Sequence, residues 1–73
     1  MKPAIPEHTI TPNGDGTFVV LVGNSRAGTV SEDKEHEGLW FVVDPEGMFM
    51  GRARSKEAAA EFLAAWFVAE DAG

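Results

Sequence analysis

Two short apolar runs constrain the fold of this sequence more than any other feature. Residues 17–22 (TFVVLV) and 39–43 (LWFVV) are rich in β-branched and aromatic side chains, and turn-forming residues flank both runs. Runs of this length between turn signals are typical of β-strands. A second segment of strand length follows each run, at 26–32 and at 48–54. The sequence therefore predicts two β-hairpins.

One helical segment follows the hairpins. Ser55 has a side-chain oxygen suited to capping a helix, and Glu57 falls in the first turn, where the helix dipole favours a negative charge. The alanine-rich segment 56–70 has a high intrinsic helix propensity. The apolar residues that recur at three- and four-residue intervals are Ala59, Phe62, Leu63, Trp66 and Phe67. We expect this stripe to pack on the sheet.

These elements predict an α+β fold, a four-stranded antiparallel β-meander packed on one face by a C-terminal helix. We expect residues 13–70 to form this single domain. Residues 1–12 are expected to be a mobile arm, because prolines interrupt it, with room for a short edge strand at 8–11. Residues 71–73 are expected to be a frayed tail. A chain of 73 residues is one small domain with a thin margin of stability.

The two hairpins also resemble one unit written twice. A displacement of about 23 positions lays Phe18 on Phe41 and Gly28 on Gly51. Equivalent residues of a repeat should face the same way, so we expect Phe18 and Phe41 to share one face of the sheet.

Both faces of the predicted sheet are apolar, although one helix can cover only one of them. Side chains alternate along a strand, so Phe41 lies on one face and Trp40 on the other. We expect the helix to cover the face of Phe18, Phe41 and Phe49. The predicted interface then consists of Trp40, Val42, Met48, Met50, Leu21, Val19, Arg52 and Arg54. The alternative is that strong curling of the sheet, or the N-terminal arm, makes these side chains internal.

An exposed apolar face with Trp, Met and Arg indicates a protein-binding surface. The expected function is non-catalytic protein binding, with homodimerisation through the open sheet face as the leading form. A small phage-type protein that docks on a host protein through the same face is a related hypothesis.

The charge balance bears on nucleic-acid binding. The chain has 6 Lys and Arg against 12 Asp and Glu, a net charge of −6, whereas nucleic-acid-binding domains usually carry a positive surplus. The alternative function is nonetheless a small nucleic-acid site at Arg26, Arg52 and Arg54, with Trp40 as a stacking surface.

Groups suited to catalysis or metal binding are scarce. Cys is absent, and the only histidines are His8, near the arm, and His36, in a charged loop. The turn Asn13-Gly14-Asp15-Gly16 does not match a calcium loop, because the position that requires a bidentate Glu holds Val22. We therefore expect no enzyme activity, cofactor or metal. No apolar run reaches the roughly 18 residues of a membrane span, so we expect a cytoplasmic protein without membrane contact.

The stretch from Trp40 to Ala58 carries the pattern W-x4-P-x-G-x3-G-x-A-x-S-x-E-A. With the first hairpin included, residues 17–67 resemble small uncharacterised proteins of actinobacteria and their phages. Strands followed by a Ser-Lys-Glu-Ala helix start are also similar to the arm-binding domains of phage-type integrases. That resemblance implies a sheet-plus-helix fold that reads DNA with a basic sheet face. Here the face expected to be open carries Trp40, Val42, Met48 and Met50 instead.

Overall fold

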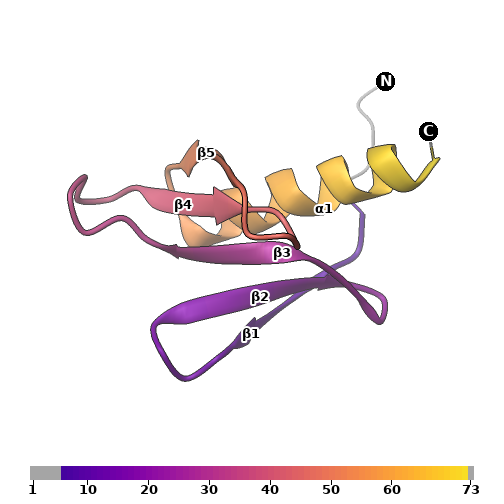
Figure 1. Ribbon diagram of the computed structural model, residues 1–73, viewed down its shortest axis with the longest axis horizontal. Helices are drawn as coiled ribbons and strands as arrows, with labels where there is room; N and C mark the ends of the chain where they lie inside the picture. The colour runs from indigo at the N-terminus through magenta and orange to yellow at the C-terminus, as the bar shows by residue number, and fades with distance from the viewer. Residues whose placement is uncertain (1–5, 73) are drawn as a thin grey trace.

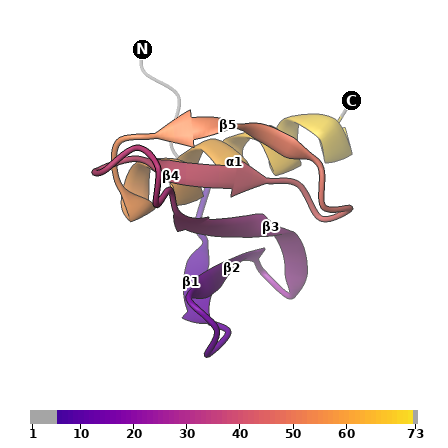
Figure 2. The same cartoon turned by 60° about the vertical axis from the view of Figure 1, so that its left-hand side comes forward.

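The computed structural model describes residues 6–72 and the side chains of residues 6–70. In chain order, the elements are β1 (Thr9–Pro12), β2 (Thr17–Val22), β3 (Ser25–Glu32), β4 (Trp40–Val43), β5 (Phe49–Ala53) and α1 (Lys56–Ala72). The strands form one antiparallel sheet in the order β1-β2-β3-β4-β5, so each strand pairs with its neighbours in sequence. Helix α1 lies against one face of this sheet and leaves the other face uncovered (Figures 1 and 2).

The predicted α+β fold is confirmed, but the sheet has five strands where four were expected. The additional strand is β1, which pairs Ile10 with Val20 at the edge of the sheet. Ile10 packs against the core, and this burial explains why a strand forms in a segment of threonine and proline. Residues 1–5 of the expected arm lie outside the described residues. The helix extends to Ala72, Gly73 lies outside the described residues, and fraying of 71–73 stays a prediction.

The turns form at the predicted positions. Between β2 and β3, Gly23 has a φ of 63°, which suits the first central residue of a type II′ hairpin turn. Between β4 and β5, the Gly47 amide donates to the Asp44 carbonyl at 3.0 Å, and Gly47 has a φ of 91°. Ser55 caps α1 as expected, since its Oγ accepts from the Ala58 amide at 3.0 Å.

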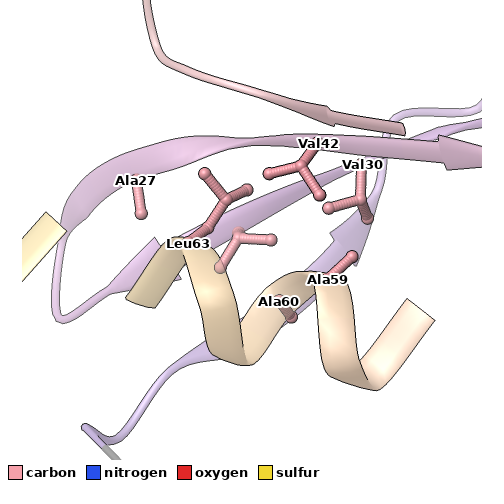
Figure 3. Packing of buried hydrophobic residues seen from close by; sticks show 7 residues of the cluster. Ala27, Val30, Val42, Ala59, Ala60 and Leu63 are labelled. Carbon is pink, nitrogen blue, oxygen red and sulfur yellow. The ribbon is translucent and has the colours of Figure 1, made fainter. Parts of the chain in front are cut away.

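The core lies between α1 and the strands β2, β3 and β4. Leu63 is fully buried and points from the helix toward Val30 and Val42, with Ala59 and Ala60 beside it (Figure 3). Small side chains on the helix let its backbone come close to the sheet. Phe62, expected in the packed stripe, is instead 46% exposed.

Gly28 makes the close approach of the helix possible. A Cβ at this position would clash with the Val43 carbonyl oxygen and lie 2.8 Å from the Leu63 Cδ2 atom. Its φ of 152° also falls in a region that side chains rarely adopt. Leu63 therefore occupies the space into which the Cβ of any other residue at position 28 would extend.

The helix covers the expected face of the first hairpin, that of Phe18, but in the second hairpin Phe41 and Phe49 lie on the open side. In the register, Phe18 lies opposite Val30, and Val30 lies opposite Val42, so Phe18 shares a face with Val42 and not with Phe41. Val20 pairs with Gly28 as Val42 pairs with Gly51, so the first strands of the two hairpins correspond at a displacement of 22, which places Phe18 on Trp40, while the two glycines correspond at 23. A one-residue difference exchanges the two faces of a strand.

Candidate interaction surface on the open sheet face

The open face of the sheet is the surface that α1 does not cover, and it is lined by apolar and hydroxyl side chains. One row of directly paired residues crosses all five strands: Thr11, Val19, Thr29, Val43 and Phe49. A second row contains Thr17, Ser31, Phe41 and Arg52. Leu21, which lies between Thr9 of β1 and Arg26 of β3, belongs to the same face. Apolar and hydroxyl groups thus lie next to each other across the sheet.

The strands contribute no carboxylate to this face. Glu32 is the sole acidic residue within the five strands, and it pairs with Trp40, which is on the helix-covered side. The other acidic residues of the described chain lie before β1, in the segments between strands and in α1. For a chain with a net charge of −6, the strands of this face thus carry little of the negative charge.

Two phenylalanines and an arginine form a cluster on the open face, at the strands β4 and β5. The rings of Phe41 and Phe49 meet edge to face with centroids 5.6 Å apart. The guanidinium carbon of Arg52 lies 5.2 Å from each ring centroid. Such cation–π contacts favour an ordered arginine over one that moves freely in solvent. Phe49 is 55% exposed and forms the outer part of this cluster.

Asp33 holds the Arg52 side chain in place. Its carboxylate is 1% exposed, and its Oδ2 accepts from the Arg52 Nε at 2.5 Å and lies 2.9 Å from the His36 Nδ1. Its Oδ1 accepts from the amides of Glu35 and His36 at 2.9 and 3.2 Å. Burial acts to raise the pKa of Asp33, but the hydrogen bond from Arg52 and those from the loop outweigh burial and lower the pKa. Asp33 therefore remains charged.

The predicted interface residues are divided between the two faces. Val19, Leu21 and Arg52 lie on the open face as register positions of β2 and β5. The expectation that the second face would expose Trp40, Val42 and Met50 is wrong. Val42 is 1% exposed, and Trp40 and Met50 pack against the core beneath α1.

The remaining two predicted residues border β5. Met48 precedes the strand and is 65% exposed, and Arg54 follows it and is exposed. The sequence prediction missed Phe41, Val43 and Phe49, which it had placed under the helix. In β4 the predicted alternation holds with the two faces exchanged. In β5 a register shift breaks it, so Phe49 lies opposite Val43 on the open face while Gly51 lies opposite Val42 on the helix-covered side.

The arginines of the alternative nucleic-acid site do not form one cluster with Trp40. Arg26 pairs with Leu21 at the β2–β3 end of the open face, whereas Arg52 lies in β5. Trp40 is on the helix-covered side, where its ring is 5.9 Å from that of Phe18. The stacking surface expected beside Arg52 is provided instead by Phe41 and Phe49.

The described residues were also searched for a metal site and for a membrane-spanning helix. Within the described residues, no group of three or more His, Asp or Glu side chains could hold a metal ion. Among the same residues, no helix has the length and apolar character needed to cross a bilayer. No family model, curated protein or solved structure matches the chain.

Proposed function

We propose that this protein is a non-catalytic interaction module that forms a homodimer by stacking the open faces of two sheets. The observation that carries the proposal is that Val19, Val43 and Phe49 lie in one row of the face that α1 leaves uncovered. Antiparallel sheets usually place polar side chains on a solvent-facing side. An uncovered face with aromatic and branched side chains supports a binding role.

The charge distribution favours a second copy as the partner. In a two-fold dimer, the same surface meets itself, so any charge near the axis approaches its own copy. Acidic surfaces of this chain would repel one another, while the open face has no carboxylate in its strands. The charge of Arg52 is balanced by Asp33 within the same chain.

The size of the face indicates a weak dimer. Five strands about 4.8 Å apart and about five residues long make a plane of roughly 20 by 17 Å. Stable dimers bury about 800 Å² on each partner, which exceeds this plane before its corrugation is counted. We therefore expect a dissociation constant in the micromolar range, with association visible only at high protein concentration.

Light scattering coupled to size exclusion tests the proposal. The wild-type mass should rise from 7.8 kDa toward twice that value as concentration increases. Val19→Lys places a charge in the middle of the face and should prevent this rise. Ala65→Lys adds the same charge on an exposed position of α1 and should leave the rise unchanged. Circular dichroism checks that both variants fold. A wild-type chain that stays monomeric at high micromolar concentration would contradict the homodimer.

The same face in a heterologous complex is the related form of the proposal, in which a phage-type protein docks on a host protein. Its signature would be a monomeric wild-type chain that captures a partner from the native host. Val19→Lys would lose that partner, and Ala65→Lys would keep it.

The second candidate function is binding of single-stranded nucleic acid, which the grouping of Phe41, Phe49 and Arg52 favours. Bases stack on free aromatic faces. Here the arginine already lies over both rings and is paired with Asp33, so we rank this function second. Salt-dependent binding of a fluorescent oligonucleotide, lost in Phe49→Ala, would support it, and no binding at low salt would exclude it.

A further inference from the structure

Strand β5 forms one edge of the sheet, and exposed apolar side chains gather around it. Among the described residues, β5 pairs with β4 on one side, and no strand pairs with its other side (Figures 1 and 2). Four large hydrophobic side chains are exposed among these residues, and three of them lie in or beside β5. Met48 and Phe49 are at the start of the strand, and Phe62 extends from α1 toward a groove beside it.

The groove runs between β5 and α1 and is mostly apolar. It has a volume of about 300 Å³, and its lining residues are Val42, Met50, Gly51, Arg52, Ala53 and Phe62. An edge strand next to an apolar groove is the arrangement that an added strand uses, because backbone hydrogen bonds align it and alternate side chains enter the groove.

Charge changes sign along this edge. Glu46 precedes β5 and Arg54 follows it. The nearby Lys56 ammonium is instead 4.6 Å from the centroid of the Phe18 ring, in β2. Neither Glu46 nor Arg54 forms an ion pair with any side chain of residues 6–70. The edge therefore has an acidic end and a basic end with charges available to a partner.

We propose that β5 pairs in antiparallel orientation with β5 of a second copy, so that two sheets join edge to edge. A two-fold axis near Gly51 would bring Arg54 of each copy opposite Met48 of the other, two residues away from Glu46 of the other. The basic end of each strand then faces the acidic end of its partner. Parallel pairing would align like charges and is disfavoured.

This contact is separate from the stacked open faces. Edge pairing uses the backbone of β5 and the groove at Phe62, whereas stacking uses Val19 and Val43 on the strands β2 and β4. One two-fold interface gives a particle of twice 7.8 kDa, and two such interfaces on one chain give a larger one.

Cysteine cross-linking tests the orientation directly, because the natural chain has no cysteine to interfere. Met48→Cys and Arg54→Cys are prepared separately and oxidised alone or as a mixture. Antiparallel pairing places residue 48 of one copy opposite residue 54 of the other, and two copies of residue 48 about 20 Å apart. The mixture should form a disulfide-linked dimer several-fold more than either variant alone. Equal cross-linking of the single variants would overturn the proposal.

A charge exchange provides the second test. Glu46→Lys or Arg54→Glu alone should weaken edge pairing about threefold to tenfold, because each places like charges together. The double variant E46K/R54E should recover association, because it exchanges the two opposite charges that antiparallel pairing brings together. Failure to recover would contradict antiparallel pairing. Val19→Lys should leave the 48–54 cross-link intact, and its loss in that variant would mean that the edge contact depends on stacked faces.

Discussion

The Arg52 Nε lies 2.5 Å from the Asp33 Oδ2, across a separation of 19 residues in sequence. Asp33 directly follows β3, and Arg52 belongs to β5, so their contact reaches past β4. The same carboxylate accepts two amides of the loop between β3 and β4. One buried side chain thus fixes both the conformation of this loop and the position of Arg52 on the open face.

Asp33→Asn should therefore lower stability in a pH-dependent way. The folded-state pKa of Asp33 is below its ordinary value, so its charged form stabilises the native state above the unfolded pKa. That contribution is lost as the pH falls through the folded pKa. The difference in Tm between wild type and variant should be largest near pH 7 and shrink below about pH 4. Glu35→Gln, an exposed change in the same loop, should show little difference at any pH.

Adjacent helix positions should differ sharply in their effect on stability. Leu63→Ala removes a fully buried side chain and should lower the free energy of unfolding by about 2 to 5 kcal/mol. Phe62→Ala removes a larger side chain that is 46% exposed and should cost less than about 1 kcal/mol. Urea denaturation of both variants measures the contrast. Equal losses would show that the helix packs with a different face.

Glycine substitutions separate a steric clash from backbone strain. Gly28 and Gly47 both have a positive φ, but only at Gly28 would a Cβ meet neighbouring atoms. Gly47→Ala should cost about 1 to 2 kcal/mol, the penalty for a left-handed backbone. Gly28→Ala should cost more, because the Val43 carbonyl and Leu63 must move. Thermal unfolding in parallel decides the order, and a milder effect at Gly28 would be inconsistent with the close approach of the helix.

A carboxylate introduced beneath α1 should destabilise the fold more than one introduced on the open face. Trp40→Glu places a carboxylate beneath α1, where Trp40 packs against the core, and should destabilise the fold by more than about 2 kcal/mol. Val19→Glu changes the open face and should have a smaller effect. Near-ultraviolet circular dichroism during thermal unfolding compares them. A stable, folded Trp40→Glu chain would argue that the uncovered face is the one carrying Trp40.

Local chemistry made most of the elements predictable from sequence. The strand at 17–22, the turn at Gly23 and the helix after Ser55 all form where side-chain preferences place them. Strand β1 was foreseen only as a short edge strand that the arm had room for, because its stability depends on the packing of Ile10 against a core that other segments form. Tertiary burial of this kind leaves almost no local signal.

The alternation of side chains along a strand does not specify which face of the sheet the helix covers. Both faces of β4 are apolar, so the sequence pattern permits either Trp40 or Phe41 beneath the helix. The pairing of β3 with β4 places Glu32 opposite Trp40 and Val30 opposite Val42, so Trp40 and Val42 lie beneath α1. The alternation within β4 does not specify this register.

The agreement between sheet order and chain order has a consequence for the kinetics of folding. Each pairing joins consecutive strands, so the chain closes only short loops as the sheet assembles. The isolated hairpins have no hydrophobic cover until α1 docks, since Leu63 and its alanine neighbours form the other side of the core. Hairpin formation should therefore be rapid and reversible, with helix docking as the step that commits the chain. Stopped-flow refolding should show one exponential phase that Leu63→Ala slows and Val19→Lys leaves nearly unchanged.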